Sequence, residues 1–246
     1  GFELQLDKTQ KTCPWKDLGL KIAETTIMPQ KISIKDNPRT LQELHQLYGS
    51  LNWVRPWLGL TIEDLAPLFN LLGGGGDLTA PRSLMAEARK VIELASDATS
   101  KRQAHRYLPT LPFEFIVLGK APHFHTLIFQ DSLVIIEWVF LPHQPSKTIS
   151  MPQELMVGLV IRGRARLRTL CGCDFSCIFL PIVVDQLEQV LQLNESLQFA
   201  LDSYLGQISS HHPKHKLFNE TFSILPKEVQ SRKPLQDALT LFTDGS

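Results

Sequence analysis

The sequence predicts a multi-domain α+β chain in which a small β layer is followed by a helical module and then by an α/β module. Two changes in the hydrophobic pattern predict this order. Apolar residues alternate with polar ones at first, recur at helical spacing from Thr40, and form strand-like runs between helices after about Arg102. We therefore divide the first 236 of the 246 residues into 1–34, 35–105 and 106–236.

The first 34 residues contain short runs in which apolar and polar side chains alternate. These runs are Phe2–Leu6, Leu18–Ile22 and Ile27–Ile34, and the Cys13-Pro14 pair supplies a turn between the first two. Alternation places every second side chain on the same face of a strand. We therefore expect a small, half-buried sheet.

Residues 35–105 are expected to form helices. Thr40 is a suitable N-cap for the first helix, because Glu43 follows three residues later, and Pro56 is expected to end it. The apolar residues of this helix are Leu41, Leu44, Leu47, Tyr48 and Leu51. A second helix is expected over Ile62–Leu72, before a run of glycines, and a third over Pro81–Thr99, with proline in its first turn.

Residues 106–236 are expected to alternate strands with helices. The expected strands are Phe113–Leu118, Thr126–Phe129, Leu133–Phe140 and Cys177–Pro181, and the expected helices are Pro152–Leu170 and Asp185–Leu205. Leu239–Thr243 is a last strand-like run near the end of the chain. Because that strand has no successor with which to pair, we expect the sequence to be a fragment.

Composition excludes several classes of protein. With 43% apolar and 20% charged residues, a chain of this length can bury a large core without disulfides or metals. The 25 basic residues balance the 25 acidic ones, so binding to nucleic acid would have to use a local patch. No apolar stretch reaches the roughly 18 residues that cross a bilayer. We expect a soluble, intracellular chain without a leader, whose cysteines are reduced.

Signatures of cofactor, phosphate or nucleophile sites are missing from the sequence. The run Gly73–Gly76 lacks the Lys-Ser/Thr pair of a P-loop and the third glycine of a dinucleotide fingerprint. Ser50 lacks the following glycine of a nucleophile elbow. The chain also has no adjacent Asp-Asp pair.

Two groups of residues resemble metal ligands but have simpler explanations. Cys171, Cys173 and Cys177 depart from the paired spacing of zinc sites, and no histidine lies near them in the sequence. Small, half-buried residues after a helix are therefore the better interpretation, and metal binding is the alternative. The paired histidines are expected in loops; they are His123 with His125, and His211 with His212.

Four arginines form the basic cluster of the chain. On a helix, Arg162 and Arg166 share one face, and Arg164 and Arg168 share a neighbouring face. A solvated surface is the simpler expectation for all four. A face that contacts phosphates is the alternative.

Four strings of residues keep their order and spacing along the chain. They are Trp15-Lys16-Asp17-Leu18-Gly19-Leu20, Leu47-Tyr48-Gly49-Ser50-Leu51-Asn52-Trp53, Glu137-Trp138-Val139-Phe140-Leu141-Pro142-His143 and Leu241-Phe242-Thr243-Asp244-Gly245-Ser246. Together they resemble the reverse transcriptase of a retrovirus, of the betaretroviral or endogenous group K type. The resemblance implies the end of the palm with its primer grip over 1–34, a helical thumb over 35–105, a ribonuclease H-like connection over 106–236, and the first strand of the ribonuclease H domain over 237–246.

The resemblance also implies which residues contact a template–primer duplex. The primer grip would be a hairpin that holds the primer 3′ end, with Trp15, Lys16, Leu18 and Gly19 as its contacts. Small Gly19 suits a close approach of the backbone.

The helix from Thr40 to Trp53 would lie along the minor groove of the duplex. Gly49 would admit the duplex closely, Trp53 would stack on sugars, and Asn52 would flank them. Without the resemblance, a core position at the helix end would be the better interpretation of Trp53. His45 stands where the family usually has glutamine, and Gly73 where it has a basic residue.

Further contacts are implied in the second half of the chain. His143 would contact the primer strand ahead of the nuclease. If the helix over Pro152–Leu170 faces the duplex, Arg162 and Arg166 are the residues on it that we expect to contact phosphates. Asp244 would be the first of four carboxylates that hold two Mg²⁺ ions in the intact enzyme. No cofactor is expected for this segment alone.

The implied function is to bind and position an RNA–DNA hybrid or DNA duplex for RNA-directed DNA synthesis and cleavage of the RNA strand. The expected partners are this duplex and the rest of the polymerase, with dimerisation left open and no membrane. The expected location is the cytoplasm or a viral core. The main alternative is a protein-interaction module that binds no nucleic acid.

We predict that the chain by itself neither extends a primer nor cuts a hybrid. Two-metal chemistry needs several carboxylates converging on one site, whereas the sequence offers no Asp-Asp pair and, by the resemblance, only Asp244 of the nuclease set. Primer extension and hybrid cleavage with Mg²⁺ present measure both activities. Primer extension that a chelator abolishes would contradict the prediction.

Overall fold

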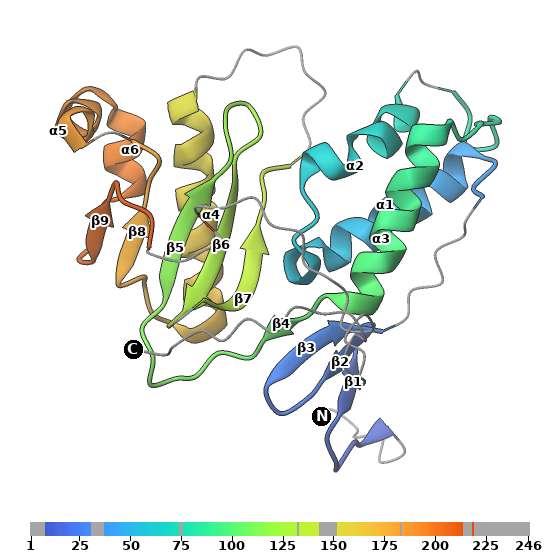
Figure 1. Cartoon of the computed structure of the whole chain (residues 1–246), viewed down its shortest axis with the longest axis horizontal. Helices are drawn as coiled ribbons and strands as arrows, with labels where there is room; N and C mark the ends of the chain where they lie inside the picture. Colours follow the sequence, from blue (N-terminus) through green and yellow to red (C-terminus); the bar gives the residue numbers. More distant parts are fainter. Residues whose placement is uncertain are drawn as a thin grey trace, which may run out of the picture.

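The computed structural model describes residues 8–30, 37–73, 76–131, 133–142, 152–182, 184–213 and 218. A small antiparallel sheet, a group of helices and a five-stranded sheet follow one another through these residues (Figure 1). This mixture of helices and sheets confirms the α+β fold class. None of the helices described in the structure is long and apolar enough to cross a membrane.

The small sheet contains four short antiparallel strands in the order β1-β2-β3-β4. Their bounds are β1 Trp15–Asp17, β2 Leu20–Ile22, β3 Thr26–Pro29 and β4 Ala104–His105. Leu18 and Gly19 make the turn between β1 and β2 with φ values of +43° and +80°. A two-residue hairpin turn with both φ values positive matches the twist of its strands, and glycine adopts it without strain. The expected strand Phe2–Leu6 lies outside the described residues.

Strand β4 was not predicted, because it contains two residues and has no pattern of its own. It follows the helical module in the sequence but pairs with β3, where Thr26 faces His105. The sheet is thus completed by residues about 80 positions away, where Arg106 also donates a main-chain hydrogen bond to Thr25 O at 2.9 Å.

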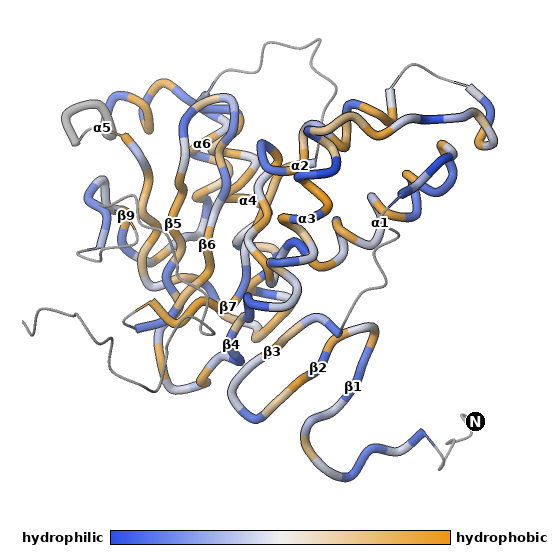
Figure 2. Tube along the Cα trace, turned by 45° about the vertical axis from the view of Figure 1, so that its right-hand side comes forward, coloured by the Kyte–Doolittle hydropathy of each residue, from blue (hydrophilic) through white to orange (hydrophobic). Residues whose placement is uncertain are grey.

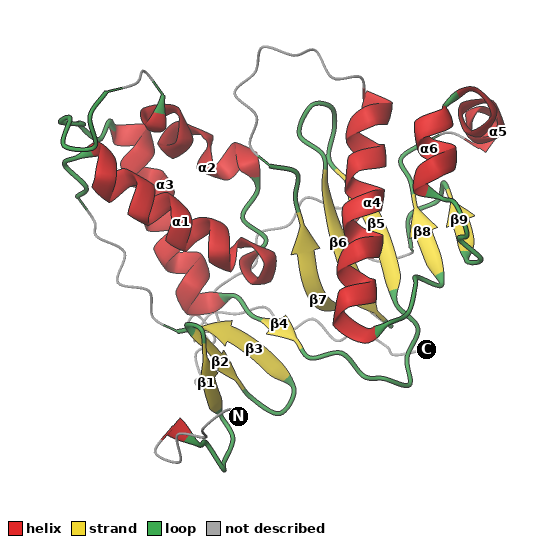
Figure 3. Cartoon of the chain, turned by 180° about the vertical axis from the view of Figure 1, so that it is seen from behind, coloured by secondary structure: helices red, strands yellow, loops and turns green. Residues whose placement is uncertain are grey.

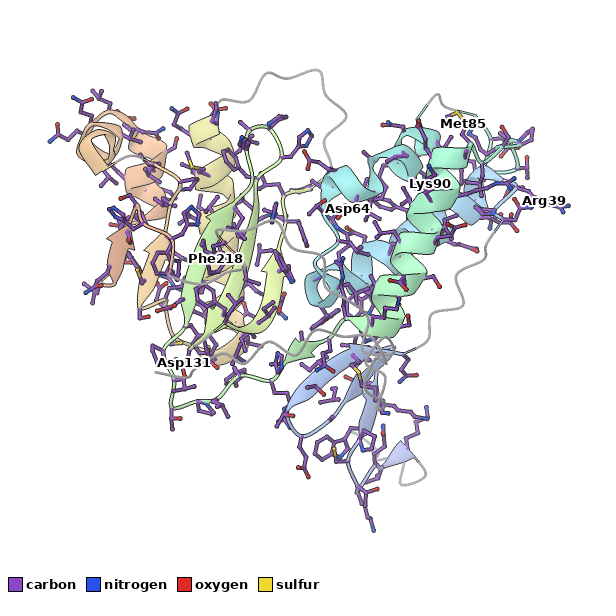
Figure 4. The ribbon with its side chains drawn as sticks, viewed as in Figure 1. Arg39, Asp64, Met85, Lys90, Asp131 and Phe218 are labelled. Carbon is purple, nitrogen blue, oxygen red and sulfur yellow. The ribbon has the colours of Figure 1, made fainter. Side chains whose placement is uncertain are left out.

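The helical module contains α1 Leu41–Leu58, α2 Ile62–Phe69 and α3 Ala86–Lys101, with a short 3₁₀ turn, η2, at Asn70–Leu72. Thr40 caps α1 as expected, because its hydroxyl accepts a hydrogen bond from the Glu43 N–H. Asp64, labelled in Figure 4, closes a capping box with Thr61 at the start of α2. The three helices enclose a core whose largest fully buried members are Leu44, Leu51, Leu58, Leu60, Leu65 and Leu68.

The bounds of two helices differ from the prediction. Helix α1 does not end at Pro56 but continues to Leu58, where Gly59 in the left-handed conformation donates to Arg55 O at 2.9 Å. Proline in the last turn removes one main-chain donor and leaves the rest of that turn intact. Helix α3 begins at Ala86 instead of Pro81, because the preceding segment is extended and pairs with the start of α1.

That extended segment completes the N-terminal cap of α1. Ala80 O accepts from the Leu41 N–H at 3.1 Å, and Leu78 O accepts from the Gln42 N–H at 2.9 Å. The first turn of a helix has main-chain donors without partners inside the helix. Contacts with residues 78–80 therefore satisfy donors that the Thr40 cap alone would leave open.

The large sheet has the order β7-β6-β5-β8-β9, and α4 Pro152–Cys171 covers one of its faces (Figure 3). Strands β5 Glu114–Leu118, β6 His125–Gln130 and β7 Val134–Val139 are antiparallel, whereas β8 Cys177–Phe179 and β9 Gln207–Ser209 run parallel to β5. Figure 2 shows mostly apolar residues along β5 and β6. These strands are buried on both faces: Phe115 and Ile128 face α4, while Ile116 and Leu127 face the opposite side.

Two features of this sheet depart from the prediction. The helix expected over Asp185–Leu205 is divided into α5 Val184–Leu193 and α6 Glu195–Ala200, because Asn194 accepts from the Leu197 N–H at 2.9 Å and caps a new helix. Strand β9 was missed, because a three-residue strand carries too little alternation. On the face opposite α4, Phe218 packs on Phe129 with a centroid distance of 6.0 Å (Figure 4).

The helical module and the large sheet meet at the end of α1. We call Arg55, Gly59, Trp138 and Phe140 the α1–β7 junction. The Arg55 guanidinium lies 4.2 Å from the centre of the Phe140 ring, and its Nε donates to Leu60 O at 2.9 Å. A Cβ atom on Gly59 would come within 2.7 Å of the Trp138 indole. The junction thus leaves no room for a side chain at Gly59.

We predict that Gly59→Ala lowers the free energy of unfolding by about 1–3 kcal/mol, through left-handed strain at φ +63° and overpacking against Trp138. Gly49→Ala in the middle of α1 is the matched control, since a Cβ there meets nothing within 4 Å. The control should be stabilised by about 0.5–1 kcal/mol, the usual gain for alanine over glycine inside a helix. Urea unfolding measures both variants, and equal effects would contradict the proposed packing.

Candidate nucleic-acid interface

The turn of the β1–β2 hairpin lies against α1. The Trp53 indole N–H donates a hydrogen bond to Leu18 O at 3.1 Å, and the Trp53 ring meets Trp57 edge-on at 5.7 Å between centroids. Trp53 nevertheless remains 48% exposed. The interpretation of Trp53 as a core residue is therefore wrong: its edge is anchored and much of its ring faces solvent.

A groove of about 510 Å³ runs beside this contact and is bounded by all three regions of the fold. The hairpin and α1 supply most of its walls, and β7 and α4 supply one residue each. Its lining is Asp17, Leu18, Leu20, Gly49, Asn52, Trp53, Pro56, Trp57, Glu137 and Arg166. The groove therefore brings together Leu18, Gly49, Asn52, Trp53 and Arg166 from the residues that the sequence predicted.

The other predicted residues of the hairpin and α1 lie outside the lining. Trp15 is half-buried under the Arg106 guanidinium, which lies 5.9 Å from the ring centre, and the side chain of Lys16 is exposed. Gly19 forms the exposed turn. His45 is exposed four residues before Gly49, so both share a face of α1, and its Nδ1 lies 2.9 Å from Leu41 O.

Arg166 reaches the groove as half of an ion pair. Its Nε lies 2.9 Å from both carboxylate oxygens of Glu137, and its Nη2 lies 2.8 Å from one of them. The Glu137 side chain is 10% exposed and that of Arg166 is 39% exposed. With Asp17 also in the lining, the groove has more acidic than basic groups.

The remaining arginines of α4 have other partners. Arg164 is buried and pairs with Asp174 at 2.8 Å, and Arg168 reaches the same carboxylate at 2.8 Å. Arg162 is exposed and donates to Phe140 O at 3.1 Å. The expected solvated face is therefore wrong for Arg164, which is buried, whereas Arg162 and Arg168 are exposed and Arg166 is half-exposed. Carboxylates nevertheless hold three of the four arginines.

Asp174 is the centre of the second arginine pair. Its burial opposes ionisation, but hydrogen bonds from Arg164, the Phe175 N–H and Arg168 outweigh burial and lower its pKa. A lowered pKa means that this carboxylate stabilises the fold above the unfolded-state value of about 3.9, and that the contribution is lost as pH falls through the folded-state value. Arg164 and Asp174 therefore have a structural role.

The described residues contain no group of three or more histidine, cysteine or acidic residues that could hold a metal ion. The alternative of a metal site at Cys171, Cys173 and Cys177 is therefore wrong: Cys177 is buried in β8, away from the turn that carries the other two. Asp244, His143 and the run Leu239–Thr243 lie outside the described residues.

One of the paired histidines is not in a loop. His125 begins β6 and packs on Trp138 with 5.8 Å between ring centroids, and burial lowers its pKa. His123 lies in the preceding turn, 3.7 Å from Glu63 on α2. His211 and His212 follow β9 in a loop, as expected.

Sequence reasoning missed the partner of Arg166. Glu137 stands alone as a charge in the apolar run of β7, and a charge inside a buried strand usually has a partner. That signal could have identified Glu137. Its partner could not be chosen, because four arginines of α4 were equivalent in the sequence.

Comparison with known proteins matches both larger regions. Residues 29–93 match the family model of the reverse transcriptase thumb domain, and residues 122–218 match that of the ERVK-8-like, RNaseH-like domain. Similar proteins include the Gag-Pro-Pol polyproteins of Mouse mammary tumor virus (strain BR6), Mason-Pfizer monkey virus and Simian retrovirus SRV-2, each 32% identical over 249 aligned residues. Each alignment covers 100% of this chain and 14% of the polyprotein.

Proposed function

Because the chain belongs to the retroviral reverse transcriptases of the betaretroviral type, with a thumb domain followed by a ribonuclease H-like domain, we propose that it binds and positions a template–primer duplex. The observation that carries the proposal is the groove in which Leu18, Gly49 and Trp53 meet. The duplex would be an RNA–DNA hybrid or DNA. The whole enzyme would use it for RNA-directed DNA synthesis and cleavage of the RNA strand.

The shape of the groove suits the sugars of a duplex. Gly49 leaves the surface of α1 open, since nothing lies within 4 Å of where its Cβ would be. One turn later on the same face, Trp53 offers an exposed ring that its hydrogen bond to Leu18 O keeps in place. Leu18 is itself 72% exposed and adds apolar surface at the hairpin. Apolar and aromatic surface of this kind packs on sugars or bases without reading their sequence.

The charges of the groove support the same mode of binding. Phosphates are repelled by Asp17 and Glu137, and Arg166 is engaged by Glu137. Phosphate contacts would come from exposed basic residues beside the groove, of which Arg162 is the one on α4 without a carboxylate partner among those described. The proposed surface that contacts the duplex is thus apolar, and this surface contributes little to the salt dependence of duplex binding.

The remaining parts of the proposal concern the intact enzyme. Residues 1–34 would end the palm, and residues 106–236 would form the connection before a ribonuclease H domain that starts at about 237. Mg²⁺ would be needed there for hydrolysis, with Asp244 as one ligand and His143 near the primer strand. The described residues do not fit a two-metal site, and they would act by holding the duplex. The rest of the polymerase is the proposed protein partner, in the cytoplasm or a viral core.

A protein-interaction module is the second candidate function. Three apolar side chains near α5 and α6 are mostly exposed: Leu193 (84%), Phe199 (77%) and Leu205 (99%). Exposed apolar side chains of this kind are available for contact with another protein. Binding of a labelled RNA–DNA hybrid separates the two functions, since a module that contacts only protein should not bind the hybrid.

We predict that Trp53→Ala weakens binding to an RNA–DNA hybrid by about 1–3 kcal/mol, the range for loss of an aromatic contact to nucleic acid. Folding should survive, because the side chain is half-exposed. Trp53→Phe is the matched control: it keeps an aromatic ring, loses the bond to Leu18 O and should bind more tightly than the alanine variant. Fluorescence anisotropy with a labelled hybrid measures affinity, and urea unfolding measures stability. Unchanged affinity with a large loss of stability would contradict the assignment.

We also predict that Glu137→Gln strengthens hybrid binding. Glutamine keeps an oxygen for Arg166 but removes the negative charge, so the guanidinium becomes available to a phosphate. The slope of log K against log salt should steepen by up to about 0.9, the duplex value for one added phosphate contact. Asp97→Asn on α3, outside the groove, is the control for removing any acidic charge.

A double-variant comparison tests whether Arg166 causes the gain. Glu137→Gln should lose most of its effect when Arg166→Gln is present. A gain that persists in that background, or one that Asp97→Asn reproduces, would show that the ion pair does not control binding.

A further inference from the structure

Two cysteine thiols are in direct contact at the end of α4. Helix α4 ends at Cys171, and Gly172, with φ +72°, donates its N–H to Arg168 O at 2.9 Å. This left-handed turn places Cys173 beside Cys171, with 3.2 Å between the two sulfur atoms. A left-handed glycine is a common way to end a helix, and here it also pairs two thiols.

The spacing of these thiols suits a disulfide better than a metal. Residues two apart have Cα atoms at most about 7 Å from each other, and disulfides span about 4.4–6.8 Å. The sulfurs must approach by about 1.1 Å to reach the bond length of about 2.05 Å, given their 3.2 Å separation. A soft metal would need further ligands, and the described residues place no third metal-binding group there.

The two thiols are also accessible to a reagent in solution. Cys173 is exposed and Cys171 is half-buried, with its thiol donating to Leu167 O at 3.3 Å. Cys177 is buried, and Cys13 is half-buried in the region of the small sheet, where its described contact is Ile22 O. An oxidant in solution therefore meets Cys173 first, and the neighbouring thiol of Cys171 is in position to follow.

We propose that Cys171 and Cys173 are a redox modification site that forms a reversible intramolecular disulfide with hydrogen peroxide. One sulfur, as the thiolate, attacks peroxide, which breaks the O–O bond and gives a sulfenic acid and one water. The second sulfur then attacks the first, forms the S–S bond and releases the second water. Two thiols and one peroxide become one disulfide and two waters, and an added dithiol reverses the step.

The raised pKa of Cys173 predicts that its oxidation is slow at neutral pH. Partial desolvation of the exposed Cys173 thiol and the neighbouring Cys171 thiol raise the pKa of Cys173 to about 11, so its thiolate is scarce at neutral pH and forms as pH rises. Exposed or strained disulfides have the higher reduction potentials typical of labile bonds. The oxidised turn would also carry Asp174, which holds Arg164 and Arg168, so the disulfide would form beside the contact that ties α4 to the turn.

Counting thiols after peroxide treatment of the full chain tests the proposal. The chain has four cysteines, and the count in denaturant should fall to two, with peptide mapping by mass spectrometry joining Cys171 to Cys173. A dithiol should restore all four, and oxidation should be faster at alkaline pH.

Two single variants serve as matched controls. Cys173→Ser changes an exposed residue to a near-isostere, so it should fold and should keep its three thiols under the same treatment. Cys13→Ser should still lose two thiols. A disulfide that includes Cys177, separate oxidation of each cysteine without an S–S bond, or loss of two thiols in Cys173→Ser would each overturn the proposal.

Discussion

The burial of one cation, Arg55, determines how the two larger regions of the molecule meet. Arg55 is 3% exposed, and desolvation lowers its pKa to about 10, so it remains charged at neutral pH. A buried charge is costly unless it has partners. Leu60 O, the Asn52 side chain and the face of the Phe140 ring are its partners, and the ring contact joins the last turn of α1 to the end of β7. The Arg55 Nη2 atom is buried without a hydrogen-bond partner among the described residues. The groove depends on this junction, since Asn52 and Trp53 lie just before Arg55, and Glu137 lies three residues before Phe140.

The pairing of charges around the groove makes the proposed nucleic-acid interface compatible with a chain that has no net charge. Arg166 and Glu137 neutralise each other at the wall, Asp17 adds one negative charge, and an indole ring, a glycine and a leucine supply exposed surface for packing. Such a surface supports close, sequence-independent packing more than long-range attraction. Attraction to phosphates would come from residues beside the groove, such as Arg162, or from parts of the enzyme outside this chain.

The arginines of helix α4 make contacts on two sides of the helix. Arg162 and Arg166 face β7 and the groove, whereas Arg164 and Arg168 clasp Asp174 in the turn after the helix. Removing one member of a buried ion pair leaves the other charge without a partner and typically lowers the free energy of unfolding by about 3–5 kcal/mol. Arg164 therefore has a structural role. The contacting thiols of Cys171 and Cys173 lie in the same turn as Asp174.

The local sequence pattern was sufficient to predict the elements that depend on neighbouring residues for their formation. Thr40 and the leucines of α1 predicted that helix and its start, the apolar runs predicted β5, β6 and β7, and the ordered strings of residues identified the family. The tertiary structure decided what depends on residues distant in the sequence. Strands β4 and β9 exist because β3 and β8 offer free edges, and α1 passes Pro56 because Gly59 and the junction, not proline, set its end. The partners of the four arginines could not be read from the sequence, because equal spacing on a helix says which residues share a face but not which carboxylate that face will meet.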